Sequence, residues 1–417
     1  MDRTLVVADD LTGAAELAAF VGTPDRPARV AWSGHTASAE VGARVAGGGD
    51  AAAPSIVIDT ESRNLAAYDA RARLAGVVRD LPPTSLTGVV FKKIDSTLRG
   101  PIHAEITVLH ALAGLGPVIA APAYPRMGRT TVGGVQYLND VPVADGPAGE
   151  DPVAAARVSD VGRLLPPGDH TIMRAPGDRE AGALASELAR HRRAGRHVVV
   201  DAEREADLER LAEALRSLPP GLLMGTGGLA RHLWPTRAPV SAPRGVGRIV
   251  VIVGSHHPAA RAQTALLERT YADRRDGAAR HETATEYPDE VLVLTTPSHR
   301  IEPEAALRDL EHAVEEVIAL GGVRAVVVTG GESALHVLKR VGASSFDVMG
   351  ELVDGVPIGI IVGGPWAGTI LATKAGGFGG PDVLVRAVGR LSERMPESAS
   401  PPQRPRPRRP PPPKESQ

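Results

Sequence analysis

Short apolar runs alternate with longer amphipathic stretches along most of this 417-residue chain. The apolar runs are rich in Val and Ile, as strands are, and the stretches between them have the apolar spacing of helices. In the first half we predict strands at residues 4–8, 55–58, 88–91, 117–121, 197–200 and 221–224, and helices at 13–21, 68–80, 102–113, 180–194 and 205–217. This alternation is typical of a largely parallel sheet covered by helices on both faces.

The alternation stops at residues 235–246, which are rich in Pro, Ala and Arg. Beyond them we predict strands at 248–253, 291–295, 325–328, 358–362 and 369–374, and helices at 259–270, 304–319, 333–341 and 381–390. We therefore expect an N-terminal domain (1–234), a linker (235–246), a C-terminal domain (247–392) and a disordered Pro- and Arg-rich tail (393–417). The predicted fold class is α/β, with two domains, each a largely parallel sheet flanked by helices, and an active-site cleft between them.

The composition excludes several classes of protein. Cysteine is absent, so disulfides, thiolate catalysis and cysteine-ligated metals are excluded. A net charge of −2 and an aromatic content of 3% argue against nucleic-acid binding, and no apolar run is long enough for a transmembrane helix. The first residues lack the pattern of a signal peptide. We expect a cytoplasmic protein that binds neither nucleic acid nor a membrane.

The segment after the predicted strand 88–91 carries the most informative side chains. It contains Lys93, Asp95, Ser96 and Arg99, which place both signs of charge at one strand-to-helix turn. Ligands of open α/β sheets bind at such turns, at the carboxyl edge of the strands. Arg99 can grip a carboxylate with two hydrogen bonds, and Asp95 and Ser96 can bind hydroxyls, which suits a polyhydroxy acid. The structural alternative is a solvated loop with a helix cap.

Two further loops in the first half are candidates for the same site. Asp9 and Asp10 follow the first strand, and adjacent carboxylates can bind hydroxyls, hold Mg²⁺ or act as a general base. A helix cap is the alternative, although a cap needs only a single Asp. The loop that contains Arg129 and Thr130 leads into a predicted hairpin at 135–143. This loop can cover a substrate as a lid, or it can be a surface excursion.

Three glycine-rich turns follow strands in the second half. They are Gly254-Ser255, Gly330-Gly331-Glu332-Ser333 and Gly376-Gly377-Phe378-Gly379. Glycines at the start of a helix let backbone N–H groups approach a phosphate, and the helix dipole favours the anion. Three such turns in one half indicate a nucleotide-phosphate site. The chain contains neither the G-x-x-x-x-G-K-[ST] sequence of a P-loop nor the G-x-S-x-G elbow of a hydrolase.

Two motifs suggest other chemistry. Residues 225–230 fit G-x-G-x-x-A after a strand, which leaves an NAD(P)-linked sugar-acid oxidoreductase as an alternative function. The next acidic residue after them is Glu268, too distant for the usual ribose contact. His256 and His257 are potential metal ligands, but adjacent histidines do not readily chelate one ion. The sequence therefore leaves the metal ligands unassigned.

Five motifs follow one another in the order found in a known family. They are Ala8-Asp9-Asp10-Leu11-Thr12-Gly13-Ala14, Lys92-Lys93-Ile94-Asp95-Ser96-Thr97-Leu98-Arg99-Gly100, Gly128-Arg129-Thr130-Thr131, Thr329-Gly330-Gly331-Glu332-Ser333 and Lys374-Ala375-Gly376-Gly377-Phe378-Gly379. Over residues 3–390 the chain resembles the four-carbon acid sugar kinases, which include threonate, erythronate and 3-oxo-tetronate kinases. The resemblance implies an N-terminal domain that binds a sugar acid and a C-terminal domain that binds a nucleotide. It also implies that ATP, with Mg²⁺, phosphorylates the terminal hydroxyl of the sugar acid.

The resemblance also assigns residues to the nucleotide. The ATP contacts that it implies are Ser255, Gly330, Gly331, Glu332, Ser333, Gly376, Gly377 and Gly379. The chain departs from the family at His256-His257, where small residues are frequent, and at Gly377, where Asn is frequent.

We expect direct phosphoryl transfer between the two domains, in which positioning and electrostatics supply most of the catalysis. The residues expected to bind the substrate are Asp9, Asp10, Lys93, Asp95, Ser96, Arg99, Arg129 and Thr130, and the catalytic candidates are Asp10, Asp95 and Arg99. In this hypothesis Lys93 and Arg99 hold the substrate carboxylate, and Asp10 orients or deprotonates the attacking hydroxyl. A non-catalytic sugar-acid sensor is a further alternative, and a homodimer is left open.

Overall fold

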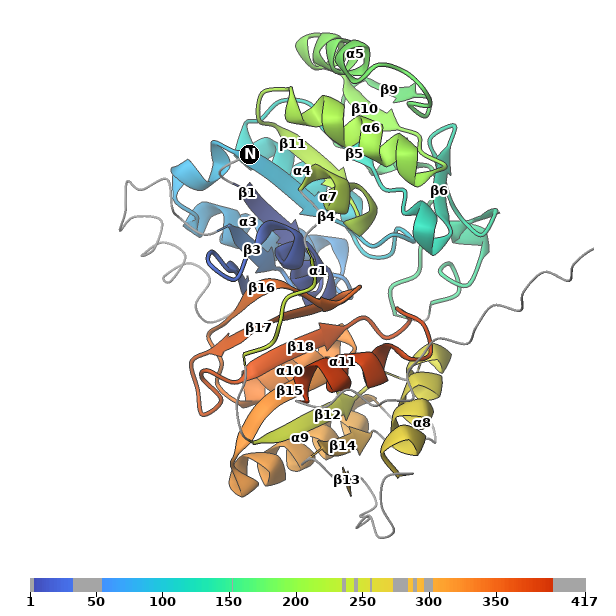
Figure 1. Ribbon diagram of the computed structural model, residues 1–417. Helices are drawn as coiled ribbons and strands as arrows, with labels where there is room; N and C mark the ends of the chain where they lie inside the picture. Colours follow the sequence, from blue (N-terminus) through green and yellow to red (C-terminus); the bar gives the residue numbers. More distant parts are fainter. Residues whose placement is uncertain are drawn as a thin grey trace, which may run out of the picture.

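One 15-stranded sheet runs through both halves of the protein (Figure 1). The computed structural model describes residues 4–32, 55–151, 153–234, 238–243, 247–255, 257–272, 284–287, 291–295 and 303–392. In order across the sheet, the strands are β13 (Ala284–Tyr287), β14 (Val291–Thr295), β12 (Arg248–Val253), β15 (Val323–Thr329), β18 (Ile370–Lys374), β17 (Val356–Val362), β16 (Ser345–Val353), β2 (Ala28–Trp32), β3 (Ile56–Asp59), β1 (Thr4–Ala8), β4 (Val89–Lys93), β11 (Leu222–Gly225), β5 (Ile119–Ala121), β10 (His197–Val200) and β9 (His170–Met173). The predicted α/β class is confirmed.

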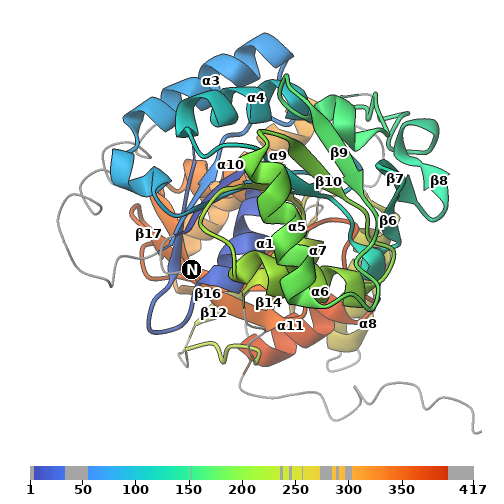
Figure 2. The same ribbon diagram turned by 90° about the horizontal axis from the view of Figure 1, so that it is seen from above.

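Helices cover both faces of the sheet (Figure 2). They are α1 (Leu11–Val21), α3 (Ala67–Asp80), α4 (Ile102–Ala113), α5 (Ala181–Arg193), α6 (Glu205–Arg216), α7 (Gly227–Leu233), α8 (Pro258–Ala272), α9 (Pro303–Leu320), α10 (Gly331–Arg340) and α11 (Val383–Leu391). In the first half α1, α5, α6 and α7 pack opposite α3 and α4, and in the second half α9 and α10 pack opposite α8 and α11. Strands buried on both faces must be apolar throughout, which explains the unbroken apolar runs of the sequence.

The direction of the strands changes where the two halves meet. The strands of the first half pair in parallel with one another, as do β14, β12, β15 and β18 in the second half. In contrast, β16, β17 and β18 form antiparallel pairs, and β16 also pairs antiparallel with β2. Each half is therefore largely parallel, and an antiparallel segment joins the halves into one sheet.

The pairing of β2 with β16 was not predicted from the sequence. Val30 lies opposite Phe346, and Arg29 lies opposite Asp347. The Arg29 guanidinium donates to both Asp347 carboxylate oxygens, from Nε at 2.7 Å and from Nη2 at 2.6 Å. Helix α1 packs against both β16 and α10, so its residues and those of the second half share one core, which includes Leu17 and Phe346. The two halves are thus held together by a packed interior.

A separate three-stranded sheet projects from the first half. It consists of β6 (Arg129–Val132), β7 (Val135–Leu138) and β8 (Val141–Pro142), in that order. The turn between β7 and β8 is formed by Asn139 and Asp140, both with positive φ, as a tight hairpin turn requires. The hairpin predicted from the sequence is therefore present.

The predicted linker and tail fall largely outside the described residues. In the linker, the structure describes 238–243, which contain no helix or strand, and the Val240 N–H donates to the Glu351 backbone oxygen at 2.7 Å. The tail, residues 393–417, lies outside the described part of the chain. Within that part, no helix combines the length and the apolar character that a membrane span needs.

We expect the Arg29–Asp347 pair to contribute to stability because it is largely buried and has bidentate geometry. Changing Arg29→Met leaves the Asp347 carboxylate without its partner, which should lower the free energy of unfolding by about 2–4 kcal/mol. The double variant Arg29→Met, Asp347→Leu should recover most of this loss, since it removes both charges. Urea unfolding measures both, and an unchanged free energy in the single variant would contradict this role.

Candidate active site

Charged loops follow three neighbouring strands at one edge of the sheet. Asp9 and Asp10 follow β1, residues 60–64 follow β3, and Asp95 to Arg99 follow β4. Because β3, β1 and β4 are parallel neighbours, their carboxyl ends meet at the same edge.

Arg63, in the loop after β3, binds the carboxylates of Asp9 and Asp10 together. Its Nε and Nη2 donate to Asp9 at 2.9 and 2.8 Å, and its Nη1 and Nη2 donate to Asp10 at 2.7 and 2.9 Å. Asp9 is buried, so its charge needs such a partner. Burial alone would lower the pKa of Arg63, but Asp10, Asp9 and Asp95 raise it well above its ordinary value. The guanidinium therefore stays charged.

Asp10 also caps α1. Its Oδ1 accepts from the Gly13 N–H at 2.9 Å, and its Oδ2 accepts from the Thr12 hydroxyl at 2.6 Å. Burial alone would raise the pKa of Asp10, but the charges of Arg63 and Lys93 and these hydrogen bonds outweigh it and lower the pKa. The structure thus assigns the cap to Asp10, and Asp9 is left to Arg63.

Lys93 places an ammonium beside the same helix terminus. A Cβ added to Gly13 would lie 2.9 Å from Lys93 Nζ and 2.8 Å from Asp10 Oδ1, so a larger residue at 13 would have to displace these two groups. Lys93 Nζ also lies 3.6 Å from the Glu16 carboxylate. Asp10 and Lys93, predicted as parts of one site, are therefore neighbours.

Asp95 and Arg99 bind each other. Nε and Nη2 of Arg99 donate to the Asp95 carboxylate at 2.9 and 3.0 Å, and Nη1 donates to Asp151 at 3.0 Å. Burial alone would raise the pKa of Asp95, but Arg63 and Arg99 hold it well below its ordinary value. Asp95 is therefore an anion, and Arg99 already meets two carboxylates of the protein.

Arg129 differs from Arg63 and Arg99, since no carboxylate among the described residues forms an ion pair with it. Its Nη1 donates to the Met127 backbone oxygen, and its Nε is buried without a hydrogen-bond partner in the described part of the chain. Burial lowers the pKa of Arg129, while the nearby Asp95 opposes this change. Arg129 therefore carries a charge with unused hydrogen-bonding capacity beside the carboxylates.

Within the described part of the chain, the side chains of Ser96 and Thr130 have no observed hydrogen bond with the charged cluster. The Ser96 backbone oxygen accepts from the Gln136 side chain at 2.9 Å, which ties the small sheet to this loop. Thr130 follows Arg129 on β6, so its side chain points to the opposite face of that strand. There it lines a hollow with Tyr137 and Arg204. The structure therefore does not bring Thr130 together with the charged cluster.

The three glycine-rich turns converge in the second half, at the carboxyl ends of the adjacent strands β12, β15 and β18. A Cβ added to Gly254 would lie 1.9 Å from Ser333 Oγ, and one added to Gly376 would lie 2.1 Å from Ser255 Oγ. The Gly330 N–H donates to the backbone oxygen of Lys374 at 2.8 Å. The turns predicted to bind the nucleotide thus touch one another, beside the N-terminus of α10.

The two departures from the family pattern lie in contact. A Cβ added to Gly377 would lie 3.0 Å from Nε2 of His257, so the imidazole takes the space of a side chain at 377. His257 also caps α8, because its Nδ1 accepts from the Ala259 N–H at 3.1 Å. His256 lies outside the described residues.

The glycine-rich turns lie close to the loop after β1 that carries Asp10. A Cβ added to Gly331 would lie 3.2 Å from Asp10 Oδ2. Beside this contact, Asn64 donates to Glu332 at 2.5 Å, and the Lys339 ammonium lies 2.5 Å from the Glu61 carboxylate. The carboxylates of the first half therefore lie at the N-terminus of α10, where backbone N–H groups and the helix dipole favour phosphate. Glu332 itself is bound by Asn64.

Residues 225–230 leave no space for a bound dinucleotide. A Cβ added to Gly227 would lie 2.0 Å from the Glu16 carboxylate, and one added to Gly228 would lie 2.3 Å from the Ala123 backbone oxygen. Protein atoms therefore occupy the space where a pyrophosphate would need to approach these glycines. The glycines allow α7 to pack closely.

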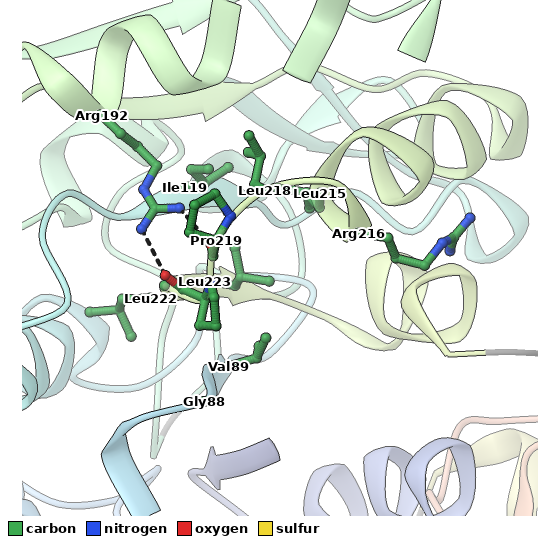
Figure 3. Close-up of a pocket in the computed structure, with 12 residues that line it drawn as sticks. Gly88, Val89, Ile119, Arg192, Leu215, Arg216, Leu218, Pro219, Leu222 and Leu223 are labelled. Carbon is green, nitrogen blue, oxygen red and sulfur yellow. Dashed lines mark hydrogen bonds between the residues drawn. The ribbon is translucent and has the colours of Figure 1, made fainter. Parts of the chain in front are cut away.

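A cavity of about 210 Å³ lies at the opposite edge of the sheet (Figure 3). It is lined at the amino ends of β4, β5 and β11, and the Arg192 guanidinium donates there to the Pro219 and Pro220 backbone oxygens at 2.9 Å each. None of the side chains predicted to bind substrate or nucleotide lines this cavity.

Sequence reasoning missed Arg63, Asn64 and Asp151. Arg63 and Asn64 follow a correctly predicted strand, so the rule that singled out Asp9 and Lys93 could have found them. Asp151 carried no such signal, because it lies in an irregular segment and meets Arg99 only through the fold.

Comparison with known proteins gives consistent matches along the chain. A family model described as a sugar-binding N-terminal domain matches residues 4–233, and one described as a nucleotide-binding C-terminal domain matches residues 250–384. A D-threonate kinase from Bordetella bronchiseptica is 35% identical, covering 93% of this chain and 97% of its own length. A 3-oxo-tetronate kinase from Methylobacterium radiotolerans is 29% identical over 93% of this chain and 98% of its own. A solved structure from Salmonella typhimurium, 22% identical, shares the fold with a TM-score of 0.72 over 94% of this chain and 100% of its own.

We expect Arg63→Lys to impair the site without abolishing folding, since a lysine keeps the charge but cannot bind two carboxylates at once. The ratio kcat/KM should fall about 100-fold, which corresponds to a loss of roughly 2.7 kcal/mol of transition-state stabilisation. Arg73→Lys is the matched control, because Arg73 donates to the Glu61 backbone oxygen of the same loop at 3.1 Å. Steady-state kinetics with ATP and four-carbon sugar acids compares the two variants, and equal activities would contradict the role of Arg63.

Proposed function

The chain belongs to the four-carbon acid sugar kinase family, and on that basis we propose that it transfers the γ-phosphoryl group of ATP to a hydroxyl of a four-carbon sugar acid. The observation that carries this proposal is the closeness of Gly331 to Asp10, since a Cβ added to Gly331 would lie 3.2 Å from Asp10 Oδ2. A phosphate at the N-terminus of α10 would lie beside groups suited to hold a hydroxyl.

The first half supplies groups for both ends of a sugar acid. Arg129 is the proposed partner of the substrate carboxylate, because its guanidinium has a buried donor without a partner in the described part of the chain. This revises the assignment made to Arg99, whose donors already meet Asp95 and Asp151. Asp9, Asp10 and Asp95 are the proposed acceptors for hydroxyls, and Lys93 adds positive charge beside Asp10.

In the transfer step, a bond forms between the substrate hydroxyl oxygen and the γ-phosphorus of ATP, while the bond to the bridging oxygen of ADP breaks. We assign Asp10 the role of orienting the hydroxyl and accepting its proton. Phosphoryl transfer passes through a loose transition state, in which the attacking hydroxyl needs little help from a strong base. Asp10, whose pKa is lowered, is therefore suited to accept the proton late in the step. The amides of the glycine-rich turns would stabilise the charge on the phosphates.

The residues at this junction also fit Mg²⁺ brought in with ATP. Among the described residues no group of three or more His, Asp or Glu is arranged to hold a metal. Glu332 nevertheless supplies a carboxylate in the first turn of α10, and Mg²⁺ is commonly held by one or two carboxylates together with substrate phosphates. Bound there, the ion would neutralise phosphate charge.

D-threonate is the first substrate we propose, since it names the activity of the relative that is 35% identical, and 3-oxo-tetronate is the second. The terminal hydroxyl is the proposed acceptor. A cytoplasmic location, where ATP is available, and a homodimer stay predictions, and gel filtration measures the second.

ADP release with Mg·ATP and a panel of four-carbon sugar acids and their epimers tests the proposal. We expect ADP formation that depends on one preferred acid, with a phosphorylated acid as the second product. NAD(P)H formation from a sugar acid would instead support the oxidoreductase. Thermal stabilisation by an acid without ADP formation would support the sensor. Either result would overturn the kinase proposal.

The assignment of Arg129 predicts a selective effect. Arg129→Met should raise KM for the sugar acid about 100-fold and leave KM for ATP near its normal value, because a charged hydrogen-bond pair is lost at one substrate only. Arg126→Met is the control, since Arg126 is exposed in the same loop and lies 3.6 Å from Asp354. Equal effects on both KM values would contradict the assignment.

A further inference from the structure

The turn after β18, residues 375–380, has its carbonyl groups bound from within the protein. Lys374, the last residue of β18, folds its side chain back beneath the turn. Its ammonium donates to the backbone oxygens of Ala375, Gly376 and Phe378 at 2.7, 3.1 and 3.0 Å. Lys374 is fully buried, and no carboxylate in the described part of the chain forms an ion pair with it.

Gln263, from α8, binds the remainder of the same turn. Its Nε2 lies 3.0 Å from the Phe378 oxygen, 3.0 Å from the Gly379 oxygen and 3.1 Å from the Gly380 oxygen. Gln263 is buried, and its Oε1 has no partner among the described residues, so its bonding is devoted to this turn. Together Lys374 and Gln263 engage the carbonyl of every residue from 375 to 380 except Gly377.

Binding the carbonyls from within has a consequence for the amides. Within one peptide unit the N–H and C=O groups point in roughly opposite directions, so the N–H groups of residues 376, 377, 379 and 380 point away from the bound carbonyls, while the Phe378 N–H donates to the Ala375 oxygen within the turn. The outer side of the turn adjoins Ser255 and the N-terminus of α10, because Gly376 packs against Ser255 and the Lys374 backbone binds Gly330. Successive amides in such a turn form an anion-binding concavity.

We propose that Lys374 and Gln263 are positioning residues, which hold turn 375–380 with its amides toward the phosphates of the nucleotide. This inference rests on the proposed kinase function. The ammonium of Lys374 also places positive charge beneath the turn. Burial lowers the pKa of Lys374 to about 8.

Gln263→Met tests the inference with the smaller disturbance, since methionine keeps the length of the side chain and loses its donor. We expect KM for ATP to rise about 10-fold, with KM for the sugar acid nearly unchanged. Thr264→Val is the matched control, because Thr264 is buried next to Gln263 but bonds to Ala260 within its own helix. Equal KM values for ATP in Gln263→Met and the control would overturn the inference.

Calorimetry can compare the binding of ADP with the binding of adenosine. A general structural defect would weaken the binding of both ligands alike. Lys374→Met and Gln263→Met should weaken ADP at least 10-fold and leave adenosine unchanged, since adenosine has no phosphates. Equal weakening of both ligands would overturn the inference. This measurement needs no turnover, so it is distinguishable from failure of the proposed function, which would appear as wild-type protein without sugar-acid-dependent ADP release.

Discussion

The part of the site proposed to bind the sugar acid depends on one guanidinium, that of Arg63, which holds the buried Asp9 carboxylate and the partly buried Asp10 carboxylate. Without Arg63, Asp9 and Asp10 would repel each other, and neither could remain charged at low cost in the interior. The loop that carries Arg63 is itself fixed from the other face of the sheet. The Ser62 hydroxyl donates to Glu105 at 2.6 Å, and Lys92 donates to the same carboxylate at 3.0 Å. A buried network behind β4 thus supports the charged cluster at the edge of the sheet.

The glycine-rich turns, proposed to bind the phosphates of ATP, reach this charged cluster because the two halves are joined. Helix α1 begins at the Asp10 cap and packs against β16 and α10 of the second half. The same helix therefore places the carboxylates and fixes their distance from the glycine-rich turns. The β2–β16 pairing and the Arg29–Asp347 ion pair hold this arrangement together. The position of the acceptor relative to the donor is thus set by core packing.

Most strands and helices could be predicted, because strands covered on both faces give unbroken apolar runs and parallel strands bring their following loops to one edge. The strands β2 and β16 could not be predicted in the same way. Their pairing joins Arg29 to Asp347, which are 318 positions apart, so no local pattern announces it. The orientation of individual side chains was also beyond the sequence. Arg99 and Arg129 look equivalent along the chain, yet only Arg99 has carboxylate partners among the described residues.

The most direct test of the account is the turnover of Gly331→Ala. The added methyl group would lie 3.2 Å from Asp10 Oδ2, at the point where donor and acceptor sites meet. We expect kcat to fall at least 10-fold while ADP and the sugar acid still bind, because the methyl group would disturb their alignment. Gly76→Ala in α3 is the control, since a Cβ there has no neighbour within 4 Å. Unchanged kcat in Gly331→Ala would contradict phosphoryl transfer across this contact.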